Sequence, residues 1–358
     1  MLVRAVLCIH LVAPIHRTSL CWTFLCCVDG VRGCHRGIAQ GAGVDSTKLQ
    51  AKSKPSGSEA LLEFQGVLNV VISGISFEST HGVENGVSDT SAAVRFSRGT
   101  NAIASDLKVS GFGVGVSVTH GSHVDLDDGS IMVFNAFHSG FLVTRGSSVD
   151  VVATSELQVK VFCNSGGVNA GFRVSHNSSL QLRYLAGVVA KHAVGAEACY
   201  WGIHATYSSS VYVHAVLVNG VHKGIGLVAE KSSLVEGPAA DVRNHALGVY
   251  AGQTSSVLAK PSPEMGDQAA SFSVTAECVR LDDASVADVN KAACVGSTRI
   301  ASLNGNSYAY TRYVDCGGEG PSDAASIGWE GSFIQHDDWR NCGEHAVKGG
   351  QEIGICCA

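Results

Sequence analysis

The chain has 358 residues, of which 45% are hydrophobic and 16% charged, with 42 glycines, 6 prolines and a formal net charge of −6. This apolar, charge-poor composition excludes an intrinsically disordered chain, and glycine without a period of three excludes collagen. An acidic chain with scattered Lys and Arg also argues against a nucleic-acid partner. Few strong helix formers and many Val, Ser and Gly residues predict an all-β protein of short strands.

Residues 1–57 are predicted to form an N-terminal lead or cap. An apolar run from Ala5 to Ile15 follows Arg4 and resembles a signal peptide, although His10 interrupts it and no small-x-small cleavage site follows. The run is too short to span a bilayer, so we expect no membrane span. A signal peptide, a cap and a segment foreign to the folded protein stay open as alternatives.

One sequence phrase recurs through residues 58–262 and predicts a solenoid. A typical copy contains a glycine, a short alternating strand, a polar turn, a Ser-Ser pair and a second apolar strand, as in Gly140–Val149 and Gly171–Leu180, whereas the copy Gly115–Val124 has Ser122-His123 at the turn. Variable spacing around a constant strand is typical of solenoids, in which insertions lie in loops. The aliphatic residue at the start of the second strand is called the anchor, and the anchors are Val70, Ala102, Val124, Val149, Leu180, Val211, Leu234 and Val257.

Two columns of residues are expected inside the coil, because residues two apart in a strand share a face. The first column is the anchors, and the second lies two residues later. The residue directly before each anchor, such as Ser148 or Ser179, is expected at a corner where side chains bond the backbone. An all-β sandwich is the alternative fold, but it does not predict two fixed columns. The second column reads Ile72, Ala104, Leu126, Val151, Leu182, Val213, Glu236 and Ala259, and only Glu236 breaks it.

The stretch Leu61–Phe77 resembles the early rungs of pectate-lyase-like right-handed parallel β-helices. The Gly-aromatic-x-Val phrases that end in Ser-Ser-Val resemble repeats of bacteriophage tail fibres and tailspikes of that superfamily. The resemblance covers about residues 58–262 and implies a right-handed parallel β-helix and trimeric assembly. It implies little about activity, because the same coil carries lyases, hydrolases, epimerases and inert fibres. No pectate lyase or polygalacturonase motif matches a position here.

The outward face of the second strand carries a polar patch. If the rungs stack in register, Asp125 lies beside Asp150, and Asp127 shares their face. Two carboxylates about 5 Å apart suit acid–base or nucleophilic attack on a glycosidic bond, and their repulsion would raise the pKa of one of them. These three aspartates are the candidate catalytic residues. The candidate substrate-binding residues on the next two rungs are Gln181, Arg183, Tyr212 and His214.

Other interpretations of this patch stay open. Arg183 could hold a uronate carboxylate, and Tyr212 could stack on a sugar ring. Asp125, Asp127 and Asp128 could instead bind calcium, although the spacing is not that of an EF-hand. A solvated strand face also displays polar residues without any function. We expect no cofactor and no other metal site, since the sequence lacks His-Glu-x-x-His, Walker and dinucleotide-binding motifs.

Residues 263–358 are predicted to form one further rung, at residues 278–286, and a compact Cys-containing C-terminal module. Six of the 13 cysteines lie in the last 81 residues, and no C-x-x-C spacing occurs. These six cysteines either form up to three disulfides in an oxidising compartment or stay reduced as small hydrophobes. The module either caps the last rung or drives assembly into a homotrimer.

Together these patterns predict a structural and adhesive protein of the phage tail-fibre or tailspike kind. Such a protein belongs to a virion or to the extracellular space, and it presents a lateral face to a polysaccharide or other cell-surface glycan. The alternative is a secreted polysaccharide lyase or glycoside hydrolase that acts on an acidic polysaccharide.

Overall fold

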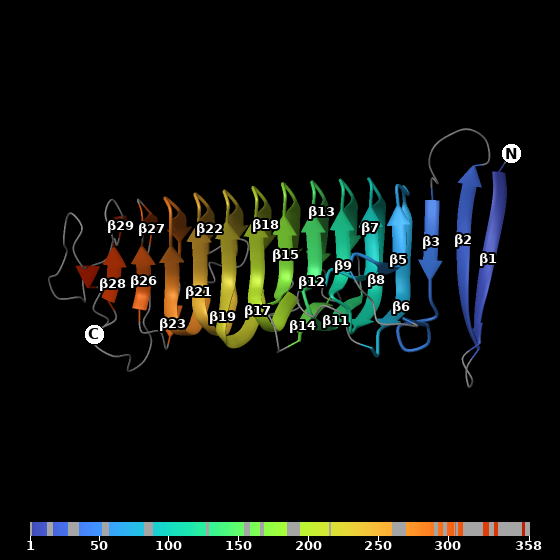
Figure 1. Ribbon diagram of the computed structural model, residues 1–358, viewed down its shortest axis with the longest axis horizontal. Coiled ribbons are helices and arrows are strands. Elements are labelled where there is room, and N and C mark those ends of the chain that lie inside the picture. Colours follow the sequence, from blue (N-terminus) through green and yellow to red (C-terminus); the bar gives the residue numbers. More distant parts are fainter. Residues whose placement is uncertain are drawn as a thin grey trace. The chain divides into compact units, whose positions relative to one another are not determined.

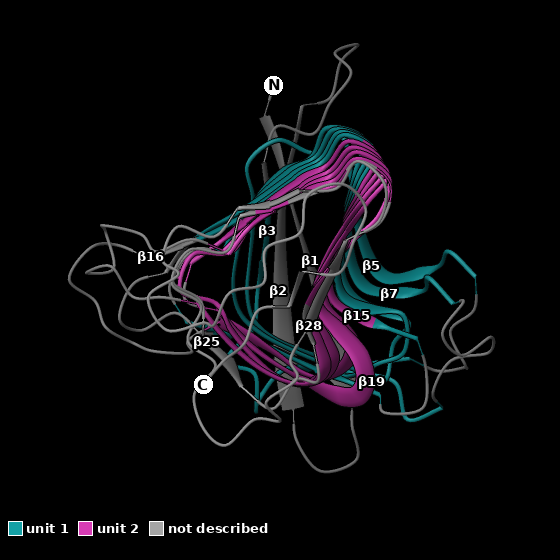
Figure 2. Cartoon of the chain, turned by 90° about the vertical axis from the view of Figure 1, so that its left-hand side faces the viewer, with its two compact units in different colours: residues 1–169, 177–189 teal, residues 170–176, 190–358 magenta. Residues whose placement is uncertain are grey.

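The computed structural model describes an all-β chain (Figure 1). The chain forms two compact units (Figure 2). Unit 1 contains residues 1–169 and 177–189, and unit 2 contains residues 170–176 and 190–358. The described residues contain no helix long and apolar enough to cross a membrane. The described residues are 2–12, 17–27, 36–51, 57–81, 89–126, 129–153, 158–164, 168–184, 194–214, 216–259, 270–289, 293–295, 299–303, 305, 307–310, 325–328, 333–335 and 353–354.

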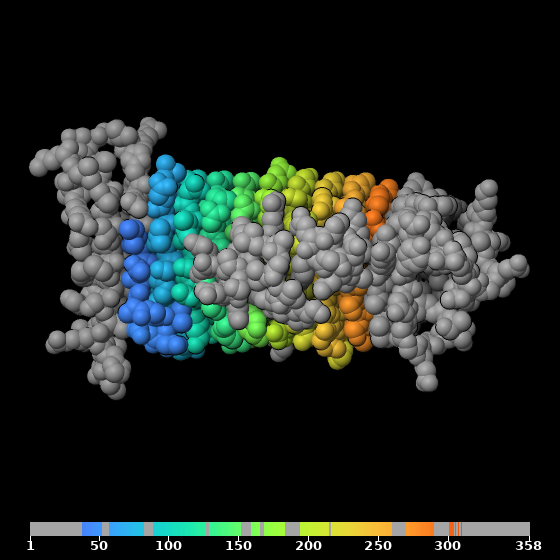
Figure 3. Space-filling view, turned by 180° about the vertical axis from the view of Figure 1, so that it is seen from behind, coloured from blue at the N-terminus to red at the C-terminus, as the bar shows by residue number. Residues whose placement is uncertain are grey.

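Unit 1 is a parallel β-solenoid preceded by antiparallel strands. β1 pairs antiparallel with β2, and β2 pairs antiparallel with β3, whereas β6, β8, β10, β13 and β16 form one parallel ladder. β7 and β12 flank β9 in a second parallel ladder. The described turns follow one another from blue to green in Figure 3. The strands are β1 (Leu2–Val12), β2 (Arg17–Cys27), β3 (Arg36–Gln40), β4 (Lys48–Gln50), β5 (Ala60–Gln65), β6 (Val70–Glu78), β7 (Ala92–Ser97), β8 (Asn101–Ser110), β9 (Val114–Thr119), β10 (His123–Leu126), β11 (Ser130–Ala136), β12 (Ser139–Thr144), β13 (Ser148–Ala153), β14 (Gln158–Cys163) and β16 (Ser179–Tyr184).

Unit 2 is also a parallel β-solenoid. β15, β17, β19, β21 and β23 form one ladder, and β18, β20, β22, β24 and β27 form another. Parallel pairing therefore continues beyond residue 262. The strands are β15 (Ala170–Ser175), β17 (Val194–Thr206), β18 (Ser210–Val213), β19 (Leu217–Glu230), β20 (Leu234–Glu236), β21 (Asp241–Gly252), β22 (Ser256–Leu258), β23 (Ser271–Leu281), β24 (Val286–Asp288), β25 (Ala293–Val295), β26 (Arg299–Leu303), β27 (Tyr308–Tyr310), β28 (Ala325–Gly328), β29 (Phe333–Gln335) and β30 (Ile353–Gly354).

The predicted register of unit 1 is confirmed. Val124 pairs with Ala102 on one side and with Val149 on the other, and Val149 pairs with Leu180. All four anchors are buried, as is the second column from Ile72 to Leu182. The period-two pattern therefore places both columns in the core, where they stack turn upon turn.

Two positions in unit 2 differ from the expected register by one residue. Val235, not Leu234, pairs with Val211 and Val257, so Glu236 lies beside Leu258 on the outward face and does not interrupt the core. The later rung is shifted in the same way, because Val257 pairs with Ala287 and leaves Val286 exposed. The predicted rung at residues 278–286 exists, whereas most of the predicted Cys-rich module lies outside the described residues.

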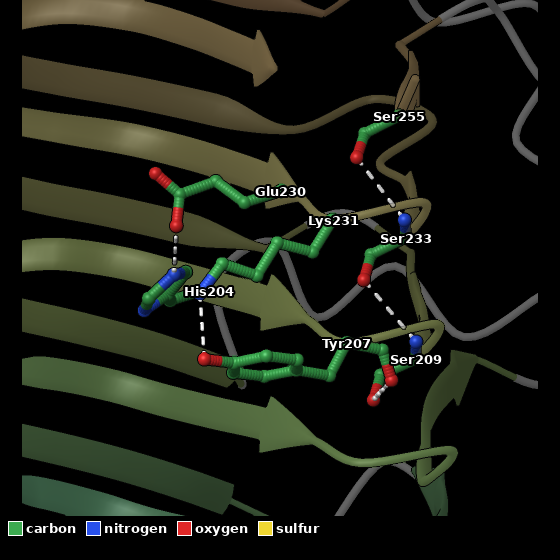
Figure 4. A network of polar contacts seen from close by, with 7 residues as sticks. All are labelled: His204, Tyr207, Ser209, Glu230, Lys231, Ser233 and Ser255. Atoms are coloured by element: carbon green, nitrogen blue, oxygen red, sulfur yellow. Dashed lines mark hydrogen bonds and ion pairs between the residues drawn. The ribbon is translucent and has the colours of Figure 1, made fainter. Parts of the chain in front are cut away.

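A ladder of buried hydroxyl groups explains this shift. The described corners from Arg98 to Ala284 have two residues with positive φ, such as Lys231 and Ser232, followed by a buried Ser or Thr. The Ser209 N–H donates to Ser233 Oγ over 3.1 Å, and the Ser233 N–H donates to Ser255 Oγ over 3.1 Å (Figure 4). From Ala102 to Ala287, the core residue in the anchor position lies two residues after this buried hydroxyl, whereas Leu68, two residues before Val70, is 45% exposed. The corner hydrogen bonds therefore come from the residue two before the anchor, not from the one directly before it as expected.

We expect Ser233→Ala to lower the free energy of unfolding by about 1–3 kcal/mol, because the buried Ser209 N–H would lose its acceptor. The matched control is Ser232→Ala, since the exposed Ser232 hydroxyl bonds only Thr254 Oγ1 at 2.9 Å and its loss should cost about 0.5 kcal/mol or less. Chemical denaturation of the two variants would measure both values. Equal stability of the two variants would contradict a structural role for the ladder.

Candidate functional site

The polar patch predicted on unit 1 is present on adjacent strands. Asp125 of β10 pairs in register with Asp150 of β13, as expected. His123, one residue before the anchor, joins them, with its Nε2 3.1 Å from Asp125 Oδ1 and its Nδ1 2.7 Å from Ser148 Oγ. The structure thus brings together two of the three candidate catalytic aspartates and adds an imidazole that the sequence analysis left aside.

A hollow lies next to this patch along the same strand face. Its volume is about 440 Å³, and Ile103 on its floor is 41% exposed. Register pairing places Ile103 between Val71 and Asp125, so the hollow follows three successive rungs. The lining residues are Asn69, Val70, Val71, Asn101, Ala102, Ile103 and Asp125.

The remaining predicted site residues are less closely grouped. Asp127 lies outside the described residues, whereas Gln181 is half-buried and pairs in register with Asp150. Arg183 lies in β16, but its side chain is outside the described part of the structure. Tyr212 and His214 belong to unit 2, where their rings lie 6.1 Å apart. His214 is only 1% exposed, which argues against its predicted role in binding a substrate at the surface.

A second cluster lies in unit 2, on the outward face of the ladder that starts with β15. Its central column pairs Arg173 with His204, His204 with Val228, and Val228 with Tyr250. The positions on either side of this column are apolar and buried in the core. Arg173, His204 and Tyr250 therefore lie on the outward face of the sheet, where His204 is only 4% exposed and the 1% exposed Val228 separates it from Tyr250.

Aromatic rings and cations are packed together around this column. The centres of the Trp201 and His204 rings lie 4.5 Å apart, and the Arg173 guanidinium carbon lies 6.0 Å from the centre of the Trp201 ring. At the neighbouring corner, the Lys231 ammonium lies 3.9 Å from the centre of the Tyr207 ring and donates to its hydroxyl over 2.6 Å. A cation over the face of an aromatic ring is attracted by the ring's π electrons, which favours the packing of these rings against Arg173 and Lys231.

His204 and Glu230 form the hydrogen-bonded centre of the cluster, as Figure 4 shows. His204 Nε2 lies 3.2 Å from Glu230 Oε2, and this hydrogen bond lowers the pKa of the Glu230 carboxyl despite its partial burial. Burial lowers the pKa of Arg173, and the nearby Glu230 charge opposes that shift. Burial, followed by the Asp282 charge, raises the pKa of Tyr250 to about 12, so its hydroxyl stays protonated at neutral pH.

The aromatic groups extend to the exposed edge of this face. Tyr207 is 44% exposed and stacks on the exposed His176 ring at 4.6 Å, with an interplanar angle of 18°. Tyr200 packs edge-on against Trp201 at 5.6 Å. The cluster of unit 2, which we call the aromatic face, consists of Arg173, His176, Tyr200, Trp201, His204, Tyr207, Glu230, Lys231 and Tyr250.

The aromatic face lies on the first strand of each phrase, so the outward positions of the second strand gave no sign of it. The first strand carried a usable signal, since Arg173, His204 and Tyr250 each stand one residue after a core position. The Tyr200-Trp201 pair was not predictable in this way, because β17 contains register shifts near Cys199 that break the alternation.

No protein-family model, no curated protein and no solved structure matches this chain. The structure shows the parallel β-solenoid that the resemblance to pectate-lyase-like β-helices and phage tail proteins implies, and none of the three comparisons supports either family.

Proposed function

We propose that this protein is an adhesive β-solenoid, comparable to a phage tail fibre or tailspike, that binds a surface polysaccharide through the aromatic face of unit 2. The observation that carries this proposal is a pair of aromatic rings that lie beside cations. The half-buried Trp201 lies in β17, and the exposed Tyr207 lies at the corner directly after it. Arg173 of β15 and Lys231 after β19, the two strands that pair with β17, place cations beside these rings. Aromatic rings offer flat apolar surfaces with a polar edge, which suits the faces of sugar rings. Arg173, Glu230 and Lys231 supply hydrogen-bonding groups for sugar hydroxyl or carboxylate groups.

The location proposed for this function is a virion surface or the extracellular space. Cys163, Cys199 and Cys278 take part in disulfide bonds. Disulfides form and persist mainly in oxidising environments, which supports a position outside the reducing cytosol.

We expect Tyr207→Ala and Trp201→Ala each to weaken polysaccharide binding at least tenfold, which corresponds to about 1.4 kcal/mol. Immobilised neutral and acidic polysaccharides would be screened with the full chain, and the affinity for any that bind would then be compared between variants. Phe134→Ala is the matched control, because this half-buried aromatic residue of unit 1 lies outside the aromatic face.

Retained affinity in both aromatic-face variants would contradict the proposal, as would the absence of binding to every polysaccharide tested. Shortening of a bound polysaccharide would instead favour the alternative function, a secreted lyase or hydrolase.

A further inference from the structure

Three potential metal ligands meet on the lateral face of unit 1. One donor atom from each of His123, Asp125 and Asp150 lies within 4.8 Å of the other two, and the described part of the chain contains no second such group of three. When three atoms lie within 4.8 Å of one another, an ion placed centrally between them is at most about 2.8 Å from each atom. Zinc–nitrogen and zinc–oxygen bonds measure about 2.0–2.2 Å. Side-chain movements of less than about 1 Å would therefore complete the coordination.

The His123 imidazole is oriented as metal-binding imidazoles usually are. Its Nδ1 lies 2.7 Å from Ser148 Oγ, and donation from Nδ1 to this hydroxyl would leave Nε2 with a free lone pair. That lone pair faces Asp125 Oδ1 at 3.1 Å. Two lone pairs at this distance repel unless a cation or a proton lies between them. The arrangement thus holds either a metal ion or a simple N–H···O hydrogen bond, and an experiment can distinguish the two.

The Asp150 carboxylate provides an independent indication of a ligand. Its Oδ1 is buried, and within the described residues this atom has no hydrogen-bond partner. A buried carboxylate oxygen without a donor is costly, and a bound cation removes that cost. The Asp125 side chain, in contrast, is 53% exposed and borders the hollow of about 440 Å³, which leaves the site open to ions from solvent.

We propose that His123, Asp125 and Asp150 bind a divalent transition-metal ion such as zinc. The imidazole distinguishes this site from a calcium site, because calcium takes six to eight oxygen ligands. The proposal differs from the calcium site considered for Asp125, Asp127 and Asp128, and it is independent of polysaccharide binding by unit 2.

Cobalt(II), a coloured substitute for zinc, is the probe for this site. The full chain without an affinity tag would be titrated with Co²⁺ and followed by visible absorption. We expect wild-type protein to bind one Co²⁺ with a nitrogen–oxygen spectrum, and His123→Gln and Asp150→Asn to bind it at least tenfold more weakly. His120→Gln is the matched control, because this imidazole lies at the preceding corner and bonds Thr119 Oγ1 and Arg145 instead.

Several results would overturn this proposal. These are no Co²⁺ binding by wild-type protein, unchanged affinity in His123→Gln, and a spectrum dominated by sulfur ligands from the cysteines. Displacement of Co²⁺ by an equal concentration of Ca²⁺ would also overturn it. Thermal unfolding provides a second measurement, since Co²⁺ should raise the melting temperature of wild-type protein only. If Asp150→Asn does not fold, the half-exposed Asp125→Asn replaces it.

Discussion

Gly202→Ala is expected to lower the free energy of unfolding by about 3 kcal/mol, at the upper end of the usual cost of overpacking a core. A Cβ atom on Gly202 would come within 2.0 Å of Val218 Cγ1 and 2.6 Å of the Gly226 carbonyl oxygen. The neighbouring glycines of unit 2 are equally crowded, because a Cβ on Gly171 would meet Ala196 Cβ at 2.4 Å. The recurring glycine of the phrase thus leaves room for a core side chain from another strand.

Gly146→Ala is the control for this prediction. Gly146 has a φ of +70° and nothing within 4 Å of its added Cβ, so the substitution introduces backbone strain of about 1 kcal/mol without a clash. Chemical denaturation would compare the two variants with wild-type protein. A Gly202→Ala variant as stable as Gly146→Ala would contradict the packing described for unit 2.

Acidification from pH 6.5 to pH 4 is expected to lower the free energy of unfolding of unit 2 by about 3 kcal/mol because of one buried residue, His245. His245 is 0% exposed, and burial lowers its pKa from 6.5 to about 4. Its ring occupies the space beside Gly220 and Gly224, and neither ring nitrogen has a hydrogen-bond partner among the described residues.

The direction of this effect follows from proton binding. Between pH 6.5 and pH 4 the unfolded chain protonates this imidazole and the folded chain does not, so each pH unit favours unfolding by about 1.4 kcal/mol. Above pH 6.5 the imidazole is neutral in both states and contributes no pH dependence. Denaturation of wild-type protein and His245→Leu at pH 7.5, 5.5 and 4.5 would measure the difference in slope.

His222→Gln is the control for the acid prediction, because this exposed histidine lies in β19 between Gly220 and Gly224, the two glycines beside the His245 ring. It should keep the wild-type dependence on pH, whereas His245→Leu should lose part of it. Parallel pH profiles for wild-type protein and His245→Leu would contradict a neutral, buried His245.

The core of this fold was predictable from the sequence because a strand has a period of two. Val124, Val149 and Leu180 could be aligned without knowing any loop length. The predicted register is wrong at Leu234, because the residue after a Ser-Ser pair is not the core residue at this corner. The physical marker is the single buried hydroxyl, and at that corner Ser232 has positive φ while Ser233 is buried.

The candidate sites were only partly predictable. The juxtaposition of Asp125 and Asp150 follows from the register alone, and the structure confirms it. The burial of His214 and the meeting of Trp201 with Arg173 depend on bends and register shifts that a repeat pattern does not encode. Sequence periodicity therefore predicts neighbours within one ladder better than it predicts which side chains stay exposed.

The most direct test of the central claim is hydroxyl-radical footprinting of the full chain with and without a saturating polysaccharide identified in the binding screen. If the aromatic face of unit 2 binds the polysaccharide, oxidation of Trp201 and Tyr207 should fall at least severalfold, while oxidation of Phe134 in unit 1 should not change. Unchanged oxidation of Trp201 and Tyr207 in the bound state would contradict the claim and place the binding surface elsewhere on the protein.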